Sequence, residues 1–282
     1  MTSPVLREAV LGEREFGLIS ELVYEHCGIN LRDGKRELVR ARLAKRLRAG
    51  RYPTFGDYVQ HVLEDTTGRE LSLLVDSLST NLTKFFREGQ HFAFLRSCLL
   101  PGLLETRQRR GDLRIRAWSA GCSSGEEPYS IAITLLEAVQ GKGCWDIKVL
   151  ATDVSLSMLE RARRGVYDMG RVEPIPLAFR HKYLVRAGGD GADAYQVGDS
   201  LRRVVILQYL NLMKTWPIKT PLDFIFCRKV MIYFDKPTQT RLIQRFHDLL
   251  APGGVLFTGH SESLTGIPHR FRYVQPTIYA KS

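Results

Sequence analysis

Apolar residues recur at helical spacing through the first third of the chain. Phe16, Ile19 and Val23 follow the three- and four-residue steps of one helix face, and the segment 31–50 has apolar residues four apart at Val39, Leu43 and Leu47. Glycine ends both segments, as it commonly does at a helix C-terminus. Two further short helical segments follow, without the alternation typical of strands. The pattern predicts an all-helical domain over residues 1–90.

From about residue 91 onward, short apolar runs alternate with helical segments. The runs are LRIRAW (113–118), IKVLATDV (147–154), RRVVILQYLNL (202–212), LDFIFC (222–227) and VLFTGHS (255–261). Near-continuous apolar strands that alternate with helices are typical of a parallel sheet covered on both faces. The last run, FRYVQPTIYA, has no helix before it and predicts an antiparallel edge strand. We therefore expect an α/β domain over residues 91–282, built on a doubly wound sheet.

One region interrupts this alternation. HKYLVRAG (181–188) and AYQVGDSL (194–201) flank a GGDGAD turn, which predicts a hairpin and a small inserted antiparallel β-subdomain over about 175–207. The insertion is either a surface elaboration or an edge that takes an extra strand from a partner peptide. The sequence alone favours the surface elaboration.

Charge and composition narrow the class of protein. The net charge of +11, from 41 Lys and Arg against 30 Asp and Glu, predicts an anionic partner: nucleic acid, a membrane surface or an acidic protein. No apolar stretch reaches the roughly 20 residues of a membrane span. The five scattered cysteines contain no C-x-x-C pair and the histidines are dispersed, so we expect no metal and a reducing, cytoplasmic location. A monomer is the default expectation.

The stretch WSAGCSSGEEPYS (118–130) places a glycine-rich turn between an apolar run and a predicted helix. Such turns often hold a phosphate, but the spacing is G-x-x-x-G, no Walker lysine follows, and Glu126 and Glu127 would repel a phosphate. A positively charged ligand without phosphate, such as S-adenosylmethionine, fits better. The alternative is that both acids only complement the helix dipole, which leaves the glycines unexplained.

Asp153 ends the second strand-like run, 153 − 125 = 28 residues after the last glycine of that turn. An acid at this place in nucleotide-binding sheets binds ribose hydroxyls. The alternative reading is a cap for the helix that begins near Ser155. Together with the glycine-rich turn, Asp153 favours a methyltransferase.

Several motifs then match a known family. They are SLSTNLTKFFRE (77–88), WSAGCSSGEEPYSIAI (118–133), ATDVSLSMLERARRGVY (151–167), NLM (211–213), FCRKVMIYFD (226–235) and LAPGGVLFTGHSESL (250–264). Over almost its full length the chain resembles the CheR-type chemoreceptor glutamate methyltransferases of bacterial chemotaxis. The resemblance implies an N-terminal helical domain joined to a Rossmann-like class I methyltransferase domain with a small β-subdomain. It also implies methyl transfer from S-adenosylmethionine to receptor glutamates, giving γ-methyl esters and S-adenosylhomocysteine.

The resemblance further implies which residues form the site. Arg87 and Tyr233 would position the substrate carboxylate; otherwise Arg87 forms a salt bridge with Glu88 and Tyr233 packs on Phe234. At position 229 the family usually has asparagine, so Lys229 adds a positive charge that would weaken cofactor binding. The residues expected at the cofactor are Asn81, Thr83, Arg87, Glu127, Asp153, Asn211, Leu212, Arg228 and Lys229.

The segment 32–51 carries nine Arg or Lys against two acids. We hypothesise that its basic helix, 35–48, docks on the acidic methylation helices of a chemoreceptor, and that a receptor peptide can bind the β-subdomain. One alternative is an RNA methyltransferase, but no aromatic residue for base stacking lies between Asn30 and Arg51, so we expect no nucleic acid partner. The other is a signalling protein that binds S-adenosylmethionine without catalysis, a reading that Lys229 keeps open.

Overall fold

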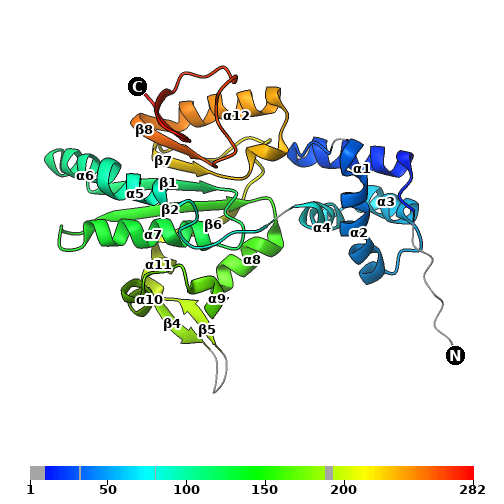
Figure 1. Ribbon diagram of the computed structural model, residues 1–282, viewed down its shortest axis with the longest axis horizontal. Helices are drawn as coiled ribbons and strands as arrows, with labels where there is room; N and C mark the ends of the chain where they lie inside the picture. The colour runs from blue at the N-terminus through cyan, green and yellow to red at the C-terminus, as the bar shows by residue number, and fades with distance from the viewer. Residues whose placement is uncertain (1–9, 32, 80, 188–192) are drawn as a thin grey trace.

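A computed structural model describes residues 10–31, 33–79, 81–187 and 193–282. The N-terminal stretch 1–9, Arg32 and most of the GGDGAD turn lie outside the described residues. The chain forms a helical bundle that lies against one edge of an α/β domain (Figure 1).

The bundle contains α1 (Glu13–Cys27), α2 (Arg36–Gly50), α3 (Phe55–Glu64) and α4 (Arg69–Leu78). Their apolar faces meet in a core of their own, where Ile19, Val39 and Leu74 have no exposed surface. The basic helix begins at Arg36, because Lys35 belongs to the preceding 3-10 turn, Asp33–Lys35. It also runs two residues beyond the expected end at 48.

The α/β domain is built on a seven-stranded sheet in the order β6-β2-β1-β7-β8-β10-β9. Strands β6, β2, β1, β7 and β8 are parallel, so their carboxyl ends share one edge, as a doubly wound sheet requires. The strands are β1 (Arg114–Ala120), β2 (Asp146–Asp153), β6 (Val205–Tyr209), β7 (Leu222–Cys227), β8 (Leu250–Thr258), β9 (Arg272–Gln275) and β10 (Ile278–Ala280).

The C-terminal run differs from expectation in one respect. It forms two strands, β9 and β10, where a single antiparallel edge strand was expected. Thr277 takes a positive φ of 62° between them and reverses the chain.

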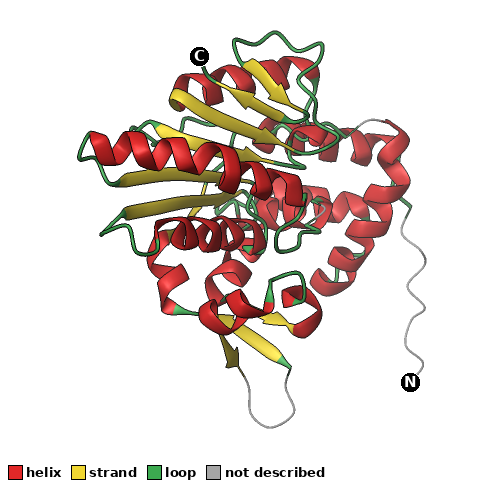
Figure 2. Ribbon diagram, turned by 60° about the vertical axis from the view of Figure 1, so that its left-hand side comes forward, coloured by secondary structure: helices red, strands yellow, loops and turns green. Residues whose placement is uncertain are grey.

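Helices cover both faces of the sheet (Figure 2). Alternate residues of a strand point to opposite faces, so Phe224 and Phe226 join one core cluster while Ile225 joins the other. The helices are α5 (Gly89–Phe94), a π-turn (Leu95–Leu99), α6 (Leu100–Arg109), α7 (Glu126–Val139), α8 (Leu156–Arg164) and α12 (Lys236–Leu249).

A separate three-stranded antiparallel sheet has the order β3-β5-β4, with β3 (Val166–Asp168), β4 (Leu184–Ala187) and β5 (Ala194–Val197). Its strands span residues 166–197, whereas the expected subdomain covered 175–207. The expected range missed β3 and ended inside β6, which pairs with β2 in the main sheet. Three short helices accompany the small sheet: α9 (Met169–Val172), α10 (Leu177–Tyr183) and α11 (Asp199–Val204).

Among the described residues, no helix combines the length and the apolar character that crossing a bilayer needs.

Candidate functional site

A pocket with about 910 Å³ of empty space, part of it open to solvent, lies at the carboxyl ends of the parallel strands. We call it the central pocket. Its lining includes all ten residues expected at the site, from Asn81 to Tyr233. The structure thus brings together five segments that are far apart in the sequence. Which of these residues touch a bound cofactor stays a prediction.

The helical bundle contributes to the pocket wall, which the sequence did not predict. Cys27, at the end of α1, and Ile29 line the pocket. They reach it because the Asn211 side-chain amide donates to the carbonyl of His26, and the Asn30 amide donates to the carbonyl of Tyr233 at 2.8 Å. No local signal in the sequence announces such a contribution, since it depends on how the two parts dock.

Gly121 and Gly125 in the glycine-rich turn adopt positive φ angles of 84° and 100°. A Cβ on Gly125 would lie 2.8 Å from the Tyr167 hydroxyl and 2.9 Å from the Ala162 Cβ, so only glycine fits. The turn needs its glycines for backbone geometry and close packing, whatever ligand it meets.

Asp153 holds the same turn against β2. Its Oδ2 accepts from the Ser123 amide at 2.8 Å, and its Oδ1 accepts from the Ser155 amide at 2.9 Å. Ser155 itself caps α8, its hydroxyl accepting from the Met158 amide. Burial raises the pKa of Asp153, although these backbone hydrogen bonds act in the opposite direction.

Glu126 and Glu127 have different partners, and this corrects the interpretation that both acids face a positive ligand. Glu126 is fully buried, accepts from the Ser124 hydroxyl at 2.7 Å and forms an ion pair with Arg171 at 2.7 Å. Glu127 does line the central pocket, but it already forms an ion pair with Arg228. The two residues diverge because successive positions on a helix differ by about 100°.

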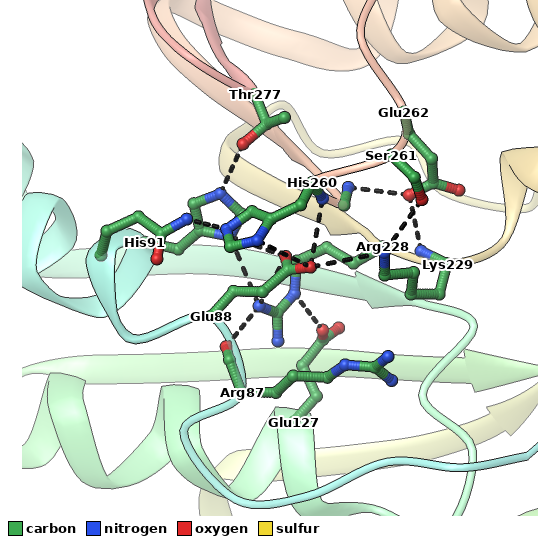
Figure 3. A network of polar contacts seen from close by, with 12 residues as sticks. Arg87, Glu88, His91, Glu127, Arg228, Lys229, His260, Ser261, Glu262 and Thr277 are labelled. Carbon is green, nitrogen blue, oxygen red and sulfur yellow. Dashed lines mark hydrogen bonds and ion pairs between the residues drawn. The ribbon is translucent and has the colours of Figure 1, made fainter.

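Arg228 is the centre of a buried polar network (Figure 3). Its Nε donates to Glu127 at 2.6 Å, its Nη1 donates to the carbonyl of Arg87 at 2.5 Å, and Glu88 lies 3.4 Å from Nη1. Burial and then Arg228 lower the pKa of His91 to about 4, so His91 stays neutral at physiological pH. The network joins the linker after the bundle to the end of β7.

Glu88 carries the charge that balances this cluster. Burial alone would raise its pKa, but the His260 amide and the Arg228 charge outweigh that effect and lower it. Arg87 does not form the alternative salt bridge to Glu88: its Nη1 donates to the carbonyl of Leu82 at 2.7 Å. Its side chain therefore remains at the central pocket, which it lines.

Lys229 adopts a positive φ of 60°, a conformation that asparagine tolerates better than lysine. Its Nζ donates to the Ser261 hydroxyl at 2.9 Å and lies 3.7 Å from Glu88 (Figure 3). The Ser261 contact holds the ammonium group, and the Glu88 carboxylate partly offsets its charge.

Glu262 is a site residue that the sequence did not single out. Its buried carboxylate accepts from the amides of Lys229 at 2.6 Å, Gly259 at 2.7 Å and Ile232 at 3.2 Å. It thereby fixes the turn that carries Arg228, Lys229 and Tyr233. The motif GHSESL contained it, but nothing local shows that this acid will accept the amides of Lys229 and Ile232 from a distant segment.

Glu88, His91 and His260 bring three possible metal-ligand atoms within 4.8 Å of one another. The dispersed histidines of the sequence had suggested no such group. However, Arg228 Nη1 lies 3.3 Å from His91 Nδ1, and Glu88 lies beside two cations. The positive charge already present makes these residues a poor fit for a divalent ion.

Comparison with known proteins covers both parts of the chain. A family model described as CheR methyltransferase, SAM binding domain, matches residues 81–280, and one described as CheR methyltransferase, all-alpha domain, matches residues 14–79. Chemotaxis protein methyltransferase 2 of Pseudomonas aeruginosa is 42% identical, over 94% of this chain and 92% of its own length. The chemotaxis protein methyltransferase of Klebsiella aerogenes is 41% identical, over 95% and 90%, and that of Salmonella typhimurium is 39% identical, over 96% and 91%.

Proposed function

Because the chain belongs to the CheR methyltransferase family, we propose that it transfers a methyl group from S-adenosylmethionine to glutamate side chains of a chemoreceptor. The observation that carries the proposal is the central pocket, whose lining combines the carboxylates of Asp153 and Glu127 with the side chains of Arg87 and Tyr233. The pocket has acids for a cationic nucleoside and a guanidinium for an anionic substrate. Both are needed for esterification of a carboxylate by a sulfonium.

The residues have separate roles in this proposal. Asp153 accepts from the ribose hydroxyls, and Glu127, which is paired with Arg228, faces the amino acid end of the cofactor. S-Adenosylmethionine supplies a methyl carbon that bonds to the glutamate oxygen as its bond to sulfur breaks, leaving a neutral thioether. Glutamate is already ionised at neutral pH, so the chain needs no general base.

Arg87 and Tyr233 then have to orient the carboxylate and exclude water. The Arg87 fork matches a carboxylate in shape and charge. Orientation of this kind can supply up to roughly 7–11 kcal/mol of the barrier. We place this reaction in the cytoplasm and propose that the protein acts as a monomer.

A radiolabelled methyl-transfer assay tests the proposal. Incubation with S-adenosylmethionine and receptor cytoplasmic fragments should place base-labile label on the receptor, as expected for a methyl ester. Label on RNA, or cofactor binding without any transfer, would overturn it in favour of one of the two alternatives. Arg87→Ala should lower kcat far more than it weakens S-adenosylhomocysteine binding.

We further propose that α2 docks on acidic receptor helices, with electrostatic steering that fades as salt rises. The structure shows which arginines of α2 are unsuitable for testing this docking. Arg46 forms two hydrogen bonds of 2.6 Å with the nearly buried Glu70, and Arg42 donates to the carbonyl of Leu78. Neutralising them would damage the bundle itself.

Lys45 and Arg48 are exposed on α2 and suit the test better. Lys45→Ala with Arg48→Ala should lower methylation at low salt without changing cofactor affinity. A matched control is Arg110→Ala with Lys142→Ala, two exposed cations beyond the amino ends of the strands. If both double variants methylate alike at low salt, α2 is not the docking surface.

Binding of a receptor peptide to the edge strand β4 also stays a prediction. Titration of the protein with a receptor peptide tests it.

A further inference from the structure

A second cavity lies behind the glycine-rich turn, outside the catalytic site. It has about 950 Å³ of empty space, open to solvent, between the end of α8, strand β3 and α9. Three guanidinium groups line it: Arg161, Arg164 and Arg171. We call it the arginine groove.

The side chains of two of these arginines make no polar contact with other described residues. The side chains of Arg161 and Arg164 are exposed, and within the described ranges neither has a hydrogen bond or an ion pair. The carbonyls of Arg163 and Arg164 at the end of α8, which would repel an anion, accept from Arg202 at 2.7 Å and 2.6 Å. The groove therefore presents a net positive charge, three guanidinium groups against the single carboxylate of Asp168, where the negative helix end is already satisfied.

The third arginine connects the groove to the turn. Arg171 Nη1 donates to the buried Glu126 at 2.7 Å and lies 3.3 Å from the Ser124 hydroxyl, while 44% of the Arg171 side chain is exposed. Its Nε has only a distant contact, 3.9 Å, with the exposed Asp168. An anion can therefore bind the outer edge of this guanidinium while the inner edge stays on Glu126.

The groove and the central pocket share a wall. Ser124 lines the groove, and its neighbour Ser123 lines the central pocket and donates its amide to Asp153. The Tyr167 hydroxyl, on β3, donates to the carbonyl of Ser124 at 2.7 Å. Arg171 thus contacts, through Ser124 and Glu126, the same turn whose Ser123 amide binds Asp153.

We propose that the arginine groove binds a phosphate-bearing small molecule, and that this binding tightens the cofactor site. Guanidinium forks match phosphate oxygens bidentately, and three of them converge here on a space of ligand size. The bound phosphate fixes Arg171, Arg171 fixes Glu126, and the turn becomes better ordered for the cofactor. Linkage requires the reverse as well: cofactor binding tightens the phosphate site by the same factor.

Titration calorimetry at constant ionic strength tests the proposal, with pyrophosphate as the probe and the full chain. Pyrophosphate should bind saturably at one site, and saturating pyrophosphate should tighten S-adenosylhomocysteine binding by at least about fivefold. Arg161→Ala with Arg164→Ala should weaken pyrophosphate binding by tenfold or more and abolish the coupling, with cofactor affinity alone unchanged.

The control variant is Arg163→Ala with Arg203→Ala, which removes two exposed arginines, one on α8 and one on α11, that do not line the groove. It should keep both the pyrophosphate affinity and the coupling. Pyrophosphate binding that is absent, that survives loss of Arg161 and Arg164, or that fails in the control would overturn the proposal. So would binding without any effect on the cofactor. None of these readouts depends on methyl transfer, so they separate this inference from the proposed function.

Discussion

Replacing Glu127 by glutamine removes a buried charge while keeping the shape of the side chain. The Glu127 carboxylate accepts from the Ser119 hydroxyl at 2.7 Å and from Arg228 Nε at 2.6 Å. Glutamine can keep both contacts, with its oxygen toward Arg228 and its amide toward a Ser119 hydroxyl that now accepts. The substitution therefore isolates the ionic part of the interaction.

The size of the effect follows from burial. The side chains of Arg228 and Glu127 are 2% and 8% exposed. At a charge separation of about 4 Å and an effective dielectric constant of about 20, their attraction is about 4 kcal/mol. The variant recovers part of this lost attraction, because burying a neutral side chain has no charge-desolvation cost and because Glu88 remains beside Arg228. We expect Glu127→Gln to lower the free energy of unfolding by about 2 kcal/mol, and Glu127→Ala by about 3–5 kcal/mol.

Urea denaturation without cofactor measures this change in the free energy of unfolding, because ligand binding then does not contribute to the stability. The midpoint should fall while the m-value stays constant. Thr134→Val is the control: it removes only a neutral hydrogen bond within α7, from the Thr134 hydroxyl to the carbonyl of Ser130, and should cost about 1 kcal/mol. If Glu127→Gln is no less stable than Thr134→Val, the buried pair does not stabilise the fold and the reasoning is wrong.

Three further outcomes can be checked. Asp153→Asn should weaken S-adenosylhomocysteine binding by about tenfold or more in calorimetry. Because the pKa of Asp153 is raised, the affinity of the wild type for S-adenosylhomocysteine should begin to fall at a pH above the usual titration range of an aspartate. The variant should lose that pH dependence. Lys229→Asn should relieve roughly 1 kcal/mol of backbone strain, seen as a higher Tm. It should also tighten S-adenosylmethionine binding more than binding of S-adenosylhomocysteine, which lacks the sulfonium charge; equal changes would contradict a charge effect. Arg46→Ala should lower the free energy of unfolding by about 2–4 kcal/mol because it leaves Glu70 unpaired, whereas an exposed neighbour, Lys45→Ala, should change it by less than about 0.5 kcal/mol.

Much of the architecture was readable from local sequence. Near-continuous apolar runs separated by helices predicted the doubly wound sheet, because strands buried on both faces need apolar residues at every position. The glycine-rich turn and the acid that ends β2 predicted a nucleoside pocket at the carboxyl edge. These features are local: the backbone freedom of Gly125 and the position of Asp153 at a strand end depend on neighbouring residues only.

Contacts between distant segments were decided by the tertiary structure alone. Glu126 and Glu127 read alike in sequence, yet one meets Arg171 and the other meets Arg228, which is 101 residues away. Which arginine each acid finds depends on the helix face it occupies and on how that helix packs. The sequence therefore determined the strand ends and the glycine-rich turn at the pocket. The packing of α7, β7 and the bundle decided that the bundle joins the pocket wall and which charges compensate one another, because such contacts act through space and not along the chain.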